Sequence, residues 1–172
     1  MTRKLSKKFV EKAEKFVEFT MLKREEIKKI RGQIIENALE IEGILEIIIV
    51  SLFVKKGQFV LFSEFILDNL TFSKKWEIIE QYIKPIGYEL FGFKFDANLR
   101  QNIRKVIEIR NMFAHGEVDF LEGDVNIPWL VYRSGKKIQK IDDNFIETTN
   151  NLFEETFKKL QPILSKCYVE VF

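Results

Sequence analysis

The only histidine of the chain, His115, lies in a short run whose side chains suit proton transfer and phosphate binding. Arg110 and Asn111 precede it. A histidine titrates near neutrality and can both accept and donate a proton, and a guanidinium stabilises negative charge on a phosphate. With an amide side chain these groups suffice for metal-free RNA cleavage, in which the ribose 2′-OH attacks the neighbouring phosphate. The simpler alternative is that His115 only caps a helix end while Arg110 makes a structural salt bridge.

Helix geometry constrains how these side chains can meet. Asn111 and His115 are four residues apart and therefore share a helix face. Arg110 follows Val106 by four residues, on or beside the apolar stripe, where an arginine needs a partner or a ligand. Arg110 and His115 are separated by about 140° around an ideal helix. The reach of the long arginine side chain, or unwinding at Gly116, could bring them to one site, and a two-fold dimer with facing helix ends would do so more readily.

Other chemistries are excluded by residue counts and missing motifs. One Cys and one His cannot build a Cys/His zinc site. The sequence has no phosphate-binding P-loop, no dinucleotide-binding glycine fingerprint and no G-x-S-x-G nucleophile motif. We therefore expect no metal and no cofactor. The single Cys167 is most simply a small apolar residue and fits a reducing cytoplasm.

The sequence also argues against a membrane location. The chain begins with basic residues, but no apolar run follows them, as one would in a secretory signal peptide. The most apolar stretch, residues 34–54, holds four carboxylates, which favours a buried helix of a cytoplasmic protein over a membrane span. They are Glu36, Glu40, Glu42 and Glu46. We interpret the Glu40 and Glu42 neighbourhood as a solvated or salt-bridged strip.

Apolar residues at three-to-four spacing predict a helical protein. Of the 172 residues, 46% are hydrophobic and 31% charged, which is typical of one globular domain over residues 1–172. The first helix, within residues 1–31, is basic and amphipathic, and residues 33–116 form the core that carries the Arg–His run. Helices are expected at 5–31, at 33–55, at 60–70, from an N-cap at Ser73 to a stop before Pro85, and from an N-cap at Asp96 to Gly116.

The pattern changes between residues 117 and 141, where turn residues become frequent. The runs 129–133 and 137–141 flank Ser134-Gly135 and predict a small β-hairpin. A last helix over residues 142–168 begins at Asp142 or Asp143 and is bent or ended by Pro162. The expected fold is all-α, a bundle of five to six helices with a small hairpin inserted between the last two.

The charges are uneven although the net charge is only +2. Residues 1–31 carry 11 basic and 5 acidic side chains, and residues 71–115 carry 8 and 5. The N-terminal helix could contact RNA phosphates, but its alternating Lys and Glu equally suit an ordinary solvated face.

The run Arg110-Asn111-Met112-Phe113-Ala114-His115 resembles the R-x4-H motif of the HEPN superfamily in its R-N-x-x-A-H form. The resemblance covers about residues 33–116. It includes a Glu-bearing apolar helix, a helix with lysine near its start at residues 73–76, and the motif at a helix end. The last helix would complete the bundle.

This resemblance implies a fold and an activity. HEPN domains are all-α bundles that commonly form homodimers with two motif copies facing each other. Many are metal-independent ribonucleases of toxin–antitoxin or other defence systems. The resemblance therefore implies a catalytic pair, Arg110 and His115, oriented by Asn111, with RNA as the substrate and an antitoxin or another protein as a partner.

A second resemblance leaves a different function open. A toxin subgroup extends its motif to R-x4-H-x-Y, where an antitoxin modifies the tyrosine, and this chain has Glu117 there. The mannitol-operon repressor family is also similar, with an R-N-x-F-A-H helix end. That resemblance implies a non-catalytic regulatory or protein-interaction module.

Overall fold

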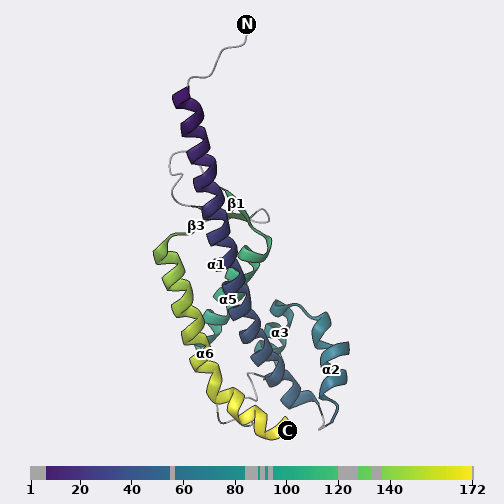
Figure 1. Cartoon of the computed structure of the whole chain (residues 1–172). Helices are drawn as coiled ribbons and strands as arrows, with labels where there is room; N and C mark the ends of the chain where they lie inside the picture. Colours follow the sequence, from purple (N-terminus) through teal and green to yellow (C-terminus); the bar gives the residue numbers. More distant parts are fainter. Residues whose placement is uncertain are drawn as a thin grey trace.

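The computed structural model is mostly helical and carries a small antiparallel sheet (Figure 1). It describes residues 7–54, 57–83, 89, 92, 95–119, 128–132 and 137–171. The predicted helical content and the predicted hairpin are both confirmed. None of the helices within the described ranges is long and apolar enough to cross a membrane.

The first helix, α1, runs without a break over Lys7–Phe53, a length of 47 residues. The prediction of separate helices at 5–31 and 33–55 was therefore wrong. Gly32 lies inside α1, where a glycine costs about 1 kcal/mol relative to alanine. Isoleucines buried on both sides of it, Ile27 and Ile34, pack into the core and hold the helix through this point.

Short helical segments follow α1 and form one side of the candidate site. They are α2 (Phe59–Phe65), the 3₁₀ turn η1 (Leu67–Asn69), α3 (Phe72–Ile78) and the π-helical turn η2 (Ile79–Ile83). The N-cap of α3 is Thr71, whose hydroxyl accepts a hydrogen bond from the amide of Lys74 at 3.3 Å, so the expected cap at Ser73 was wrong. The predicted stop before Pro85 lies outside the described residues.

The helix that carries the Arg–His run is α5, Ala97–His115. The predicted N-cap is confirmed, because the Asp96 carboxylate accepts a hydrogen bond from the amide of Leu99 at 2.6 Å. Leu99, Ile103 and Val106 are buried in the predicted register.

The predicted hairpin is present and forms part of a larger sheet than expected. Strand β2 (Trp129–Tyr132) pairs antiparallel with β3 (Lys137–Lys140). A third strand, β1 (Glu117–Asp119), pairs with β2 and follows α5 directly. Strand β1 was not predicted, because three residues are too few to show an alternating pattern. The pair Val118 and Leu130 anchors β1, and Leu130 is fully buried under it.

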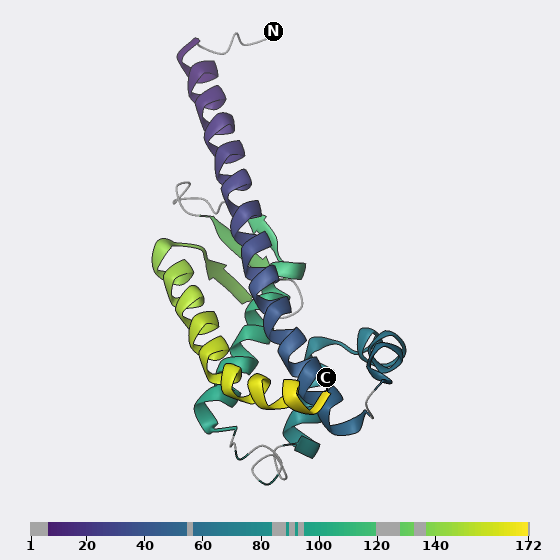
Figure 2. The ribbon, with the colours of Figure 1, turned by 60° about the horizontal axis from the view of Figure 1, so that its bottom comes forward.

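The last helix, α6 (Asp143–Val171), closes the bundle against α1 and α5. Its N-cap is Asp142, whose carboxylate accepts a hydrogen bond from the amide of Phe145 at 2.9 Å. The helix continues beyond the predicted end at residue 168 and contains Pro162. Figure 2 shows its yellow C-terminal part turning away from the direction of its first turns, so the expected bend is present but not the expected stop.

Candidate functional site

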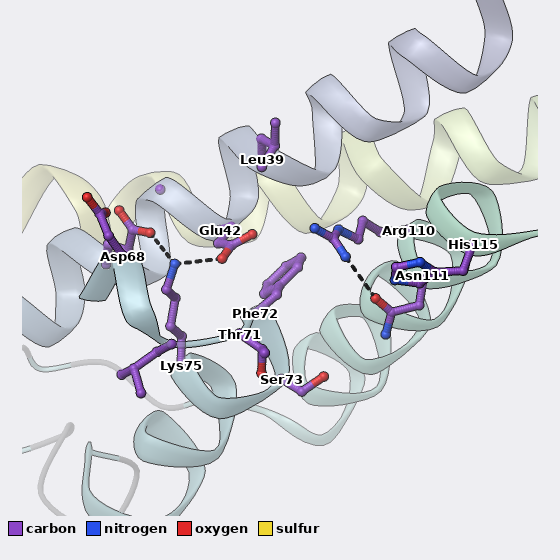
Figure 3. Close-up of a pocket in the computed structure, with 13 residues that line it drawn as sticks. Leu39, Glu42, Asp68, Thr71, Phe72, Ser73, Lys75, Arg110, Asn111 and His115 are labelled. Carbon is purple, nitrogen blue, oxygen red and sulfur yellow. Dashed lines mark hydrogen bonds and ion pairs between the residues drawn. The ribbon is translucent and has the colours of Figure 1, made fainter. Parts of the chain in front are cut away.

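A pocket of about 600 Å³ opens between α1, α3 and the C-terminal end of α5 (Figure 3). This volume is in the range of small-ligand sites in proteins. The three candidate residues of α5 all line it: Arg110, Asn111 and His115. Figure 3 shows them on one side of the pocket, Lys75 and Glu42 on the other, and the Phe72 ring between the two groups.

The sequence left open whether Arg110 and His115 could reach one site within a single chain. They line the same pocket although their positions diverge around the helix. Arg110 is half-buried and donates a hydrogen bond through Nη1 to Oδ1 of Asn111 at 3.1 Å, which holds the guanidinium beside the helix end. His115 is exposed to solvent.

The proposed structural salt bridge of Arg110 is not formed within the described part of the chain. There Arg110 makes no ion pair, and its Nε atom is buried without a hydrogen-bond partner. A buried, unpaired donor on a charged side chain is expensive in a folded protein and favours a ligand or a partner group at this position. The guanidinium therefore has unused capacity for binding an anion.

The end of α5 is fixed by contacts from outside the helix. Arg31 on α1 donates a hydrogen bond through Nη2 to the carbonyl oxygen of Gly116 at 2.7 Å, which satisfies a C-terminal carbonyl of the helix. Gly116 has an ordinary negative φ of −78°, so it is not a left-handed cap. Close packing requires glycine, because a Cβ there would lie 2.5 Å from the Met112 carbonyl oxygen and 2.9 Å from Cγ of Leu130.

A buried ionic network forms the opposite wall of the pocket. Lys75 on α3 lies 2.6 Å from a Glu42 oxygen and 2.5 Å from a Glu46 oxygen, both on α1. Its side chain is only 5% exposed. Burial disfavours the ammonium, but hydrogen bonds and charge attraction from the two carboxylates outweigh it and raise the pKa of Lys75 above its usual value. The Lys75 ammonium is therefore charged at neutral pH, and its two ion pairs tie α3 to α1.

Lys75 and Glu46 were not predicted as site residues. Glu42 was expected only in a solvated or salt-bridged strip, and the salt bridge is confirmed. The available signal was the placement of charged residues within strongly apolar helices, at positions that packing would bury. One sequence could not show which lysine on α3 faces which carboxylate on α1.

The charges lining the pocket are mixed. Three carboxylates, Glu42, Glu46 and Asp68, face two permanent cations, Lys75 and Arg110. Because Lys75 is engaged by two of the carboxylates, Arg110 is the cation available to an incoming anion. The charges of the pocket therefore favour an anion on the α5 side and disfavour one near Asp68.

The described residues contain no group of three or more His, Cys, Asp or Glu side chains that could hold a metal ion. No protein-family model matches the chain, and no curated protein or solved structure is significantly similar to it. The site's geometry and the sequence motif are therefore the basis for assigning a function.

Proposed function

We propose that this protein is a metal-independent endoribonuclease of the HEPN type, acting as a cytoplasmic toxin or defence component. The single observation that carries the proposal is the convergence of Arg110, Asn111 and His115 on one solvent-open pocket. These residues supply a proton-transfer group, a phosphate-binding cation and an orienting amide.

The chemistry needs only groups that the chain supplies. The 2′ oxygen of a ribose forms a bond to the adjacent phosphorus, and the bond from phosphorus to the 5′ oxygen breaks. In a homodimer, neutral His115 of one copy accepts the 2′ proton, and protonated His115 of the second copy donates a proton to the leaving 5′ oxygen. Arg110 stabilises the charge that builds on the phosphate oxygens. The products carry a 2′,3′-cyclic phosphate and a 5′-OH.

Each named residue has a role that the geometry supports. The exposed imidazole of His115 can reach an RNA strand that lies across the helix end. The bond from Arg110 to Asn111 limits the rotamers of the guanidinium before substrate arrives, which reduces the entropy lost on binding. The wall built by Lys75 and its carboxylates fixes α3 relative to α1 and so sets the width of the pocket.

The test is cleavage of a random single-stranded RNA pool by purified protein in EDTA. We expect the wild type to cleave and both His115→Ala and Arg110→Ala to lose at least about 100-fold in rate. Arg104→Ala is a matched control, because Arg104 is an exposed arginine on the same helix outside this pocket and pairs with Glu80. Equal cleavage by all four proteins would indicate a contaminating nuclease and reject the proposal.

A second candidate is a non-catalytic regulatory or protein-interaction module. The observation in its favour is the excess of carboxylates over permanent cations among the pocket residues, which disfavours a phosphate backbone. This candidate predicts that expression of the wild type leaves growth unchanged. Growth arrest that is relieved by His115→Ala would reject it.

A further inference from the structure

We propose that three cations on α1, the basic triplet, bind phosphates of the RNA strand next to the one at which the strand is cut. The basic triplet consists of Arg24, Lys28 and Arg31, and it lies beside the end of α5 that carries His115. This inference rests on the proposed ribonuclease function and adds where the substrate strand runs outside the catalytic pocket.

The basic triplet occupies one face of α1. Its members are spaced by four and three residues, so their side chains lie within about 60° of one another around the helix. They border a hollow of about 390 Å³ that Gly116 and Glu117 also line. Three cations face one carboxylate there, and that carboxylate already interacts with another group. The catalytic pocket has three carboxylates and two permanent cations, so a strand of phosphates is favoured over the hollow.

Most of the charge in the basic triplet is available to a ligand. Arg24 is exposed and makes no ion pair within the described part of the chain. Lys28 lies 2.5 Å from Glu25, but the two side chains are 70% and 65% exposed, and ion pairs this exposed are weak enough for a phosphate to replace the glutamate. Arg31 donates one hydrogen bond, to the Gly116 carbonyl oxygen at 2.7 Å, and its Nε is buried without a partner. This guanidinium is therefore held in place while most of its five donors stay unused.

The basic triplet continues the path of a strand that crosses the catalytic pocket. Figure 3 shows His115 at the end of the pocket farthest from Lys75, and the next residue, Gly116, lines the hollow. From Arg31 to Arg24 the helix rises about 10 Å, the length of about three nucleotides at about 3.4 Å of rise each. A strand whose scissile phosphate lies beside the imidazole therefore needs about three further nucleotides to reach the far end of the basic triplet.

This arrangement assigns substrate affinity to α1 and bond cleavage to α5. Phosphate contacts away from the reacting bond position a strand without reading its sequence. They strengthen binding before and during the reaction equally, so they lower KM and leave kcat unchanged. We therefore expect RNA that extends about three nucleotides beyond the cut to be preferred over a dinucleotide.

Two double variants of the full chain separate the basic triplet from general charge effects. Arg24→Gln/Lys28→Gln removes two of its cations, and Arg31 is left in place because it also holds the end of α5. Lys15→Gln/Lys29→Gln is the matched control, because both lysines are exposed on α1 and point at least about 100° away from the triplet. The two double variants have the same net charge. Glutamine is similar to lysine and arginine in helix propensity, so both should keep the wild-type melting temperature.

Binding is measured with a fluorescent 2′-O-methyl RNA of about 12 nucleotides, which cannot be cut because its 2′ oxygens are blocked. Anisotropy titrations at several salt concentrations give the affinity and its salt dependence. We expect Arg24→Gln/Lys28→Gln to bind at least about fivefold more weakly at about 0.1 M salt, with a salt slope reduced by about 0.7 for each lost phosphate contact. The control should keep the wild-type slope.

Cleavage kinetics provide the second measurement. For unmodified RNA of about 12 nucleotides, we expect Arg24→Gln/Lys28→Gln to raise KM and leave kcat unchanged. Cleavage of a dinucleotide should be the same in this variant and the wild type, because a dinucleotide is too short to reach the basic triplet.

Four outcomes would overturn the inference: no binding of the oligonucleotide by the wild type, equal loss of affinity in the two double variants, an unchanged salt slope in Arg24→Gln/Lys28→Gln, or an equal loss of dinucleotide and long-RNA cleavage in that variant. The two measurements also separate this inference from the proposed function. Binding through the basic triplet without cleavage of unmodified RNA rejects only the proposed function. Cleavage of long RNA with an unchanged KM in Arg24→Gln/Lys28→Gln rejects only the role of the triplet.

Discussion

Removal of the Lys75 ammonium tests how much its buried ion pairs contribute to the free energy of unfolding. In Lys75→Met, the apolar stem is kept while Glu42 and Glu46 lose their shared partner inside the protein. Breaking a buried ion pair by removing one partner costs about 3–5 kcal/mol, because a charge is left desolvated and uncompensated. A domain has only about 5–15 kcal/mol of stability in total, so the variant should lie close to unfolding.

The neighbouring lysine provides the matched control. Lys74 also pairs with a glutamate, Glu77, at 2.6 Å, but its side chain is 63% exposed. Lys74→Met should therefore change the free energy of unfolding by less than about 1 kcal/mol. Urea denaturation followed by circular dichroism measures both variants. At about 1–3 kcal/mol per molar urea, Lys75→Met should lower the midpoint by at least about 1 M.

Partner variants separate lost charge pairing from lost packing. Glu42→Gln combined with Lys75→Met removes one of the two stranded charges and should recover part of the stability. If Lys75→Met is no more destabilising than Lys74→Met, the network does not hold α3 on α1, and the description of this pocket wall is wrong.

Further predictions concern pH and the end of α5. The pKa of Lys75 is raised in the folded protein, so the ammonium's stabilising contribution is complete below about pH 10.4 and is lost as the pH rises through the pKa of the folded state. Urea midpoints measured from pH 8 to 11 should therefore fall less steeply in Lys75→Met than in the wild type. Gly116→Ala should destabilise the protein by about 1–3 kcal/mol in thermal unfolding, since its Cβ would overlap the Met112 carbonyl oxygen and Leu130; an unchanged melting temperature would contradict that packing. Arg31→Met should lower the free energy of unfolding by about 1.5–3 kcal/mol by uncapping the Gly116 carbonyl, and stability equal to the wild type would show that this bond is not important.

Most of the helical structure could be predicted from local sequence signals. The cap at Asp96 and the apolar register of α5 were predicted, because both depend on residues within a few positions of each other. The break expected near Gly32 was wrong, since tertiary packing on both sides overrides the weak helix propensity of one glycine. Strand β1 could not be predicted from three residues, because it exists only through its pairing with β2.

The candidate site shows the same division between local and long-range information. The sequence pointed to Arg110, Asn111 and His115 because they are close together in the chain. It could not identify Lys75 as the partner of Glu42, because that contact spans 33 positions and depends on how α3 lies against α1.

The chemistry of the RNA ends tests the central claim most directly. Products formed from a random single-stranded RNA pool in EDTA can be identified by mass spectrometry, with His115→Ala and a 2′-deoxy pool as controls. The proposed mechanism predicts 2′,3′-cyclic phosphate and 5′-OH ends, no cleavage of the 2′-deoxy pool, and loss of cleavage in His115→Ala. Products with 5′-phosphate ends, or cleavage that persists without the 2′-OH, would contradict the assignment of Arg110 and His115 as a metal-independent ribonuclease site.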